Sequence, residues 1–92
     1  MDAKIINELD YEHNFYTDSG HGWLKVKHIE LKILNIEHKI SKFSYKNKDN
    51  VYLEEDCDAR IFINKLKELG ITYKYHVINI DGESIIRSYE HY

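Results

Sequence analysis

The sequence contains no proline, one cysteine, four glycines and only two arginines. A single cysteine cannot form an internal disulfide, which agrees with a reducing compartment. No apolar run approaches the roughly 20 residues that a membrane helix needs. Residues 1–12 also lack the basic and then apolar pattern of a signal peptide. We therefore expect a cytoplasmic protein that does not contact a membrane.

The residues that are present are typical of one folded domain. Of the 92 residues, 42% are hydrophobic and 32% are charged, and the two kinds are regularly interspersed. This composition is that of a globular chain rather than a disordered one. Because no low-complexity tract or linker interrupts it, we expect a single compact domain over residues 1–92.

Charge is segregated along the chain although the formal net charge is only -3. Residues 1–20 hold five acids against Lys4, and residues 21–48 hold seven lysines against Glu30 and Glu37. Residues 49–58 then hold five acids and no base. Such blocks either face one another across the fold or are presented to partners of opposite charge.

Hydrophobic periodicity predicts an α+β fold. Helices are expected over about 28–34 and from Asp56 to Leu69, where apolar residues recur at helical spacing. The predicted order is β-β-α-β-β-α-β-β, with both helices on one face of a mainly antiparallel sheet. The expected strands are residues 11–17, 23–26, 39–45, 50–55, 71–80 and 83–92.

Three short strings predict how these elements end. "LKILNI" (31–36) and "LKELGI" (66–71) are similar, and each places a residue that tolerates the left-handed conformation, Asn35 or Gly70, after a helix. Asp81-Gly82 predicts a type I′ turn that joins the last two strands as a hairpin.

The acidic string "VYLEEDCDAR" (51–60) is the first candidate for a site. Glu54 and Glu55 fall on a strand, so their side chains point to opposite faces and cannot both line one site. Asp56 is expected to cap the following helix, and Asp58 to lie in its first turn near the positive end of the dipole. Between two aspartates, Cys57 is expected to be a buried structural thiol with a raised pKa.

Histidines are frequent, but none of the six lies in a spacing such as HExxH that is specific for zinc. We therefore predict no catalytic residues, no metal and no cofactor. A small hydrolase or nuclease that uses carboxylates and a histidine, such as Glu55 and His21, remains an alternative. In "GHGWLKV" (20–26), Trp23 is expected to anchor the core and His21 to bond the backbone.

A second function is suggested by the basic, aromatic segment 23–48. Lysines neutralise phosphates and aromatic rings stack on bases, which is what a single-strand binder needs. The scarcity of arginine and the negative net charge weigh against this alternative. The residues that would bind RNA or single-stranded DNA are Trp23, Lys25, Lys27, Lys42 and Lys46.

The strings "GHGWLKV", "ISKFSY" and "VYLEEDCDARIFI" together resemble a family of small, uncharacterised proteins of bacterial phages and mobile elements. The resemblance covers roughly residues 20–70. It implies a soluble, acidic protein that inhibits a host defence effector, as anti-CRISPR proteins do. The family has no assigned catalytic residues, so none is implied for this chain.

We therefore favour a non-enzymatic inhibitor that binds a basic CRISPR-Cas or other defence effector in the cytoplasm of a bacterial host. Asp49, Glu54 and Glu55 would pair with lysine or arginine side chains of the partner, and Tyr52 would be an exposed aromatic anchor. A homodimer through the edge of the C-terminal strand is a further expectation.

Overall fold

The computed structural model describes residues 9 and 12–92. Within them, six strands and two α-helices form an α+β fold in the predicted order. The strands are β1 (Glu12–Thr17), β2 (Gly22–Lys27), β3 (Tyr45–Asn47), β4 (Asn50–Glu54), β5 (Lys74–Asn79) and β6 (Glu90–His91). The helices are α2 (His28–Ile33) and α3 (Asp58–Glu68), with short 3₁₀ helices η1 (Glu37–Lys39) and η2 (Ile85–Ser88).

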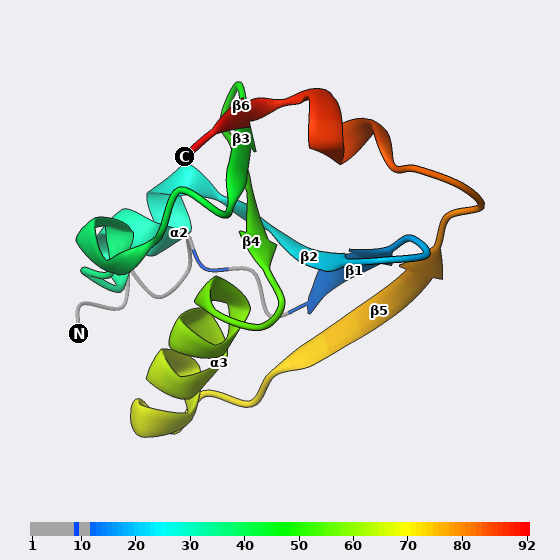
Figure 1. The fold of residues 1–92 in the computed structure, drawn as a ribbon. Coiled ribbons are helices and arrows are strands. Elements are labelled where there is room, and N and C mark those ends of the chain that lie inside the picture. Colours follow the sequence, from blue (N-terminus) through cyan, green and yellow to red (C-terminus); the bar gives the residue numbers. More distant parts are fainter. Residues whose placement is uncertain (1–8, 10–11) are drawn as a thin grey trace.

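The strands form one sheet in the order β5-β1-β2-β4-β3-β6 (Figure 1). All neighbouring strands are antiparallel except β1 and β5, which run parallel, so the sheet is mixed. This parallel pair follows from the helical crossover: α3 leads from β4, past β2 and β1, to the far edge of the sheet, where β5 begins.

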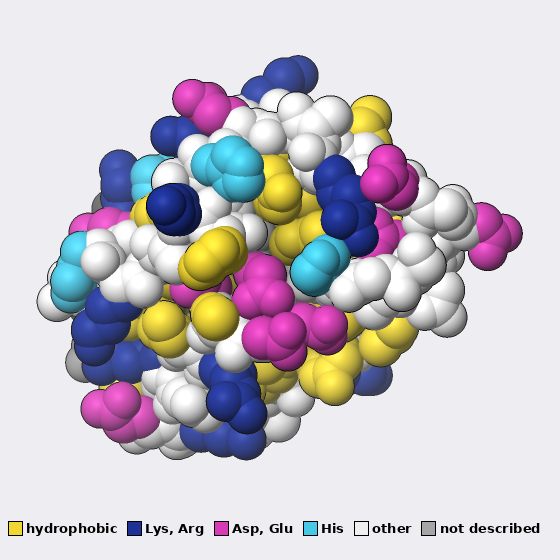
Figure 2. Space-filling model, viewed as in Figure 1, with side chains coloured by type: hydrophobic (Ala, Val, Ile, Leu, Met, Phe, Trp, Pro, Cys, Tyr) yellow, Lys and Arg dark blue, Asp and Glu magenta, His cyan; other side chains and the backbone are white. Residues whose placement is uncertain are grey.

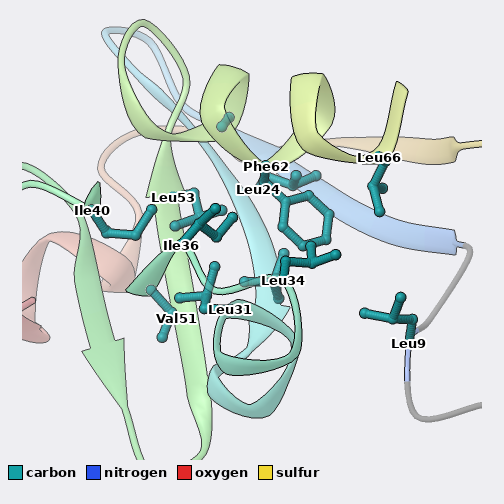
Figure 3. Packing of buried hydrophobic residues seen from close by; sticks show 12 residues of the cluster. Leu9, Leu24, Leu31, Leu34, Ile36, Ile40, Val51, Leu53, Phe62 and Leu66 are labelled. Atoms are coloured by element: carbon teal, nitrogen blue, oxygen red, sulfur yellow. The ribbon is translucent and has the colours of Figure 1, made fainter. Parts of the chain in front are cut away.

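The hydrophobic core lies between the two helices and one face of the sheet. Alternate residues of β2 and β4 supply the sheet side of this core. Figure 3 shows α2 and α3 directing apolar side chains onto that face. The residues of this core that have 0% exposure are Leu24, Leu31, Leu53 and Phe62.

Both helices end as the similar strings predict. Asn35 follows α2 with φ 56°, and Gly70 follows α3 with φ 72°. In each case the next residue's N–H bonds back to the last turn, Ile36 to the Leu31 carbonyl and Ile71 to the Leu66 carbonyl, both at 2.9 Å. These bonds satisfy carbonyl groups that the helix leaves unpaired.

The strand expected at 39–45 is wrong, because only Tyr45 of that range lies in a strand. Residues 41–44 form a turn around the buried carboxylate of Asp58, which accepts bonds from the Ser41 N–H at 3.1 Å and the Ser41 hydroxyl at 2.7 Å. The Ser44 hydroxyl donates to the same carboxylate. Side-chain bonds of this kind compete with strand pairing.

The expected C-terminal hairpin is also wrong. Gly82 has a positive φ of 77°, but Asp81 does not, so a type I′ turn is not formed. Instead β5 pairs with β1, and the chain crosses the second face of the sheet through η2 to reach β3 at the opposite edge (Figure 1). The predicted strand over 83–92 is reduced to the two residues of β6.

Neither α2 nor α3, nor any other helix within residues 9 and 12–92, has the length and apolar character required to span a membrane.

Candidate functional site

A hollow of about 330 Å³ opens on the second face of the sheet, where β2 begins and β4 ends. We call it the aromatic hollow. Figure 2 shows carboxylates gathered over the junction between β4 and α3, next to hydrophobic and histidine side chains. The residues that line the hollow are His21, Trp23, Phe43, Tyr45, Glu54, Asp56, Cys57 and His91.

Aromatic rings form a contiguous set on its walls. The Tyr45 and His91 ring centroids are 4.7 Å apart. The Trp23 ring meets Tyr45 edge-on with centroids 6.3 Å apart, and the tilted His21 ring lies 6.0 Å from it. His91 is held in place because its Nδ1 donates to the Lys42 carbonyl at 2.7 Å. Phe43 is 59% exposed, so an apolar ring remains open to a ligand.

Two carboxylates accompany these rings. One oxygen of Glu54 accepts the backbone N–H groups of Asp56 and Cys57 at 3.1 and 3.0 Å, which fixes the side chain where the chain leaves β4. The Cys57 thiol is a further hydrogen-bond partner of Glu54, whereas the exposed Asp56 carboxylate accepts no hydrogen bond from the described residues. Because a carboxylate offers about four acceptor sites, both groups keep the capacity to accept bonds from a ligand.

Cys57 also lines the hollow, and it is exposed rather than buried as expected. Partial desolvation, followed by the nearby carboxylates of Glu54, Asp58 and Asp56, raises the pKa of its thiol. The direction of this shift agrees with the sequence prediction. Because the thiolate is the nucleophile, the shift disfavours nucleophilic chemistry at Cys57.

The C-terminal segment packs against Trp23. The Arg87 guanidinium lies 5.5 Å from the centre of its ring and is bonded to Asp18 at 2.7 and 2.9 Å. Only 2% of Trp23 is exposed, so the expectation that it anchors a core is confirmed. It contributes one part of its ring to the wall of the hollow.

The arrangement suits an organic cation. The negative faces of aromatic rings attract ammonium and guanidinium groups, and carboxylates bind them by charge-assisted hydrogen bonds. A volume near 330 Å³ lies at the small end of ligand pockets, which span about 300–1,000 Å³. The hollow is thus sized for a side chain. Among residues 9 and 12–92, no three His, Cys, Asp or Glu side chains gather as metal ligands would.

The four residues predicted to bind a protein partner do not form one surface. Glu54 lines the aromatic hollow and Glu55 lines a groove beside α3, so their predicted divergence is confirmed. Asp49 lies at the opposite end of β4, where it lines a third depression with Lys32.

Tyr52 is not an exposed anchor, which corrects the sequence prediction. It is 7% exposed and packs against Tyr89, with ring centroids 5.2 Å apart. Burial, followed by the neighbouring Tyr89, raises its pKa to about 12. The reason is that the C-terminal segment covers the face of β4 that carries Tyr52.

The predicted nucleic-acid residues are likewise dispersed. Lys25 and Lys27 line a polar depression with Glu12 and Glu30, whereas Lys46 lines another with Glu90. Lys42 is exposed beside Phe43. Because Trp23 is buried, it has no free face for a base to stack on.

Asp58 lies in the first turn of α3 as expected, but the prediction that Asp56 caps this helix is wrong. Helix α3 begins at Asp58, its cap is Cys57, and no side chain caps it. The Asp58 carboxylate is instead buried, at 1% exposure, and bonds the turn at residues 41–44. The four carboxylates of residues 54–58 therefore point to three different places.

The sequence did not single out Phe43, Asp56 or His91 as parts of one site. The turn at 41–44 brings Phe43 to β4, and the pairing of β6 with β3 brings His91 there. Neither the turn nor this strand pair has a local sequence signal. The string "GHGW" did mark two of the residues that line the hollow.

Comparison of the chain with protein-family models, with curated proteins and with solved structures finds no match in any of the three. The family resemblance of residues 20–70 therefore stays a prediction.

Proposed function

We propose that this chain is a non-enzymatic binding protein whose aromatic hollow captures a cationic side chain of a basic partner protein. One observation carries the proposal: the carboxylates of Glu54 and Asp56 stand beside a contiguous set of rings around a side-chain-sized space. Arginine is the preferred ligand, since its planar guanidinium both stacks on rings and bonds carboxylates in pairs.

The partner class that we propose is a nucleic-acid-handling effector of bacterial defence, as the sequence resemblance implies. Such proteins present lysine and arginine side chains to phosphates, and an acidic protein that occupies them blocks access to nucleic acid. The chain would act stoichiometrically, as an anti-CRISPR protein does, in the cytoplasm of a bacterial host. Opposite charge would also speed the encounter.

The first test uses a short peptide with one arginine flanked by glycine and serine. Trp23 is the only tryptophan and lines the hollow, so its fluorescence reports occupancy directly. We expect saturable binding of this peptide and none of the same peptide with neutral citrulline. Loss of one charged hydrogen-bond partner is worth roughly 1.5–3 kcal/mol, so Glu54→Gln and Asp56→Asn should each weaken binding about tenfold or more.

Glu55→Gln is the matched control, because Glu55 is the adjacent acid but lines a different groove. It should leave the affinity for the arginine peptide unchanged. Equal weakening by Glu54→Gln and Glu55→Gln would show that the peptide senses only overall charge. Binding of the citrulline peptide would contradict the proposed ligand class.

The second test captures partners from a nuclease-treated bacterial lysate. We expect a basic protein that wild type and Glu55→Gln retain and that Glu54→Gln loses. Recovery of RNA or single-stranded DNA instead, with a steep loss of binding as salt rises, would favour the alternative based on the lysines.

A further inference from the structure

Strand β5 (Lys74–Asn79) lies at one edge of the sheet and is exposed along its whole length. Within the described part of the chain it pairs with β1 alone, in an unbroken register over six residues. Three of its side chains are large, apolar and open to solvent: Tyr75 at 50%, Val77 at 56% and Ile78 at 38% exposure. These exposed apolar side chains leave the edge strand open to pairing with another strand.

The backbone groups on the outer side of β5 can be assigned. The Ile80 N–H donates to the Thr17 carbonyl on β1 at 2.7 Å. Because backbone groups alternate in direction along a strand, residues 76 and 78 also face β1, whereas Tyr75, Val77 and Asn79 direct their N–H and C=O groups outward. Among the described residues, no strand pairs with this outer side.

The strand lacks the features by which monomeric proteins protect an edge. Proline, bulges and inward-pointing charges are absent from it, and its one lysine, Lys74, lies 3.8 Å from Glu12 of β1. Tyr75 and Val77 also border a groove of about 370 Å³ against α3, whose wall includes Phe15 and Ile63. An added strand would therefore gain apolar contacts as well as main-chain hydrogen bonds.

We propose that the occupant of this edge is the β5 strand of a second copy of the chain, paired antiparallel about a two-fold axis at Val77. In this arrangement Val77 faces its own copy and exchanges two backbone hydrogen bonds with it. Tyr75 then faces Asn79, and His76 faces Ile78. The two sheets become one continuous sheet.

Charge favours this occupant and this direction. Lys74 begins the strand, and the exposed acids Asp81 and Glu83 follow its end. Antiparallel self-pairing brings the lysine of each copy beside the acidic end of the other, whereas parallel pairing would oppose like charges. A symmetric contact of this type closes on itself and stops at the dimer.

The test measures molar mass by light scattering as concentration is varied. We expect wild type to approach twice 11.1 kDa. Val77→Pro removes an outward N–H and leaves the bonds to β1 intact, so it should raise the dimer dissociation constant at least about tenfold. Ile85→Lys is the control: it removes another apolar side chain, 68% exposed, outside β5, and should leave the dimer unchanged.

A cross-link tests the register. In a Cys57→Ser background, Val77→Cys should form a disulfide between copies, because directly paired residues lie about 5.5 Å apart at their Cα atoms. Ile78→Cys should not, since it faces His76 of the other copy. A monomer at all concentrations, or a dimer that survives Val77→Pro, would overturn the proposal.

Discussion

Asp18 links the first turn of the described chain to its last segment. One of its oxygens accepts the N–H groups of Gly20 and His21 at 3.0 Å, and the carboxylate also binds Arg87 and the Ser84 N–H. The Arg87 guanidinium, assisted by these N–H groups, holds the pKa of Asp18 well below its usual range, although burial opposes this shift. One ionised group thus helps to hold the C-terminal segment, together with the packing of Ile86 and the pairing of β6 with β3.

We predict that Asp18→Asn lowers the melting temperature near neutral pH. A carboxyl whose pKa is lower in the folded state contributes stability above its unfolded value, about 3.9, and loses it as the pH falls toward the folded value. The difference between wild type and variant should therefore be full at about pH 5–7 and shrink progressively below about pH 4. Thermal melts across pH measure this.

The control for this prediction is Glu68→Gln, which removes an exposed carboxylate 3.8 Å from Lys65. Exposed pairs contribute little to stability, so its melting temperature should follow wild type at every pH. A deficit in Asp18→Asn that stays constant down to pH 2 would mean that ionisation of Asp18 is not its source.

Asp58 shows how a residue with an expected local role can act at long range. Helix signals place it in a first turn, but its bonds to Ser41 and Ser44 join α3 to a turn 14–17 positions earlier in the chain. The same bonds set the position of Phe43, which lines the aromatic hollow.

We predict that Asp58→Ala destabilises the fold by about 1–3 kcal/mol, because buried donors of the 41–44 turn lose their acceptor. Asp56→Ala removes a neighbouring exposed carboxylate that caps nothing, so its effect should stay within about 0.5 kcal/mol. Urea unfolding of both variants measures the difference. Equal losses would indicate that Asp56 does cap α3 after all.

At the scale of elements, local signals predicted what depends on local structure. Strands β1, β2 and β4 and helix α3 form where the hydrophobic periodicity predicts them, and Asn35 and Gly70 have the expected left-handed backbone. In "GHGW", Gly22 permits close approach, because a Cβ there would lie 2.7 Å from the Phe15 ring. The need for glycine at this position was recognised from the sequence, but the ring that approaches it, Phe15, was not.

The failures occur where distant segments decide the structure. Residues 39–45 alternate like a strand, yet Asp58 folds them into a turn, and the Asp-Gly signal at 81–82 is overridden by pairing of β5 with β1. That pairing places Glu12–Thr17 beside residues more than sixty positions later. The aromatic hollow could therefore be predicted only in part: residues of the strings "GHGW" and "VYLEEDCDAR" were named, but not as one site with Phe43 and His91.

For the whole molecule, the two proposed surfaces lie on different parts of the sheet. The aromatic hollow involves β2, β3, β4 and β6, whereas the dimer edge is β5, at the end of the sheet opposite β6. Pairing through β5 thus leaves both hollows of a dimer open. Such a dimer would present two cation sites to one partner.

We predict that the dimer binds a peptide with two arginines much more tightly than a peptide with one. When a flexible glycine-serine linker spans both hollows, the second contact becomes intramolecular and the gain can reach about 10²–10⁴-fold. Trp23 fluorescence measures this gain as linker length is varied. Val77→Pro should keep the single-arginine affinity and lose the gain, whereas Glu54→Gln should weaken both. An undiminished gain in the Val77→Pro protein would mean that two arginines can act within one copy, and that bivalence does not arise at β5.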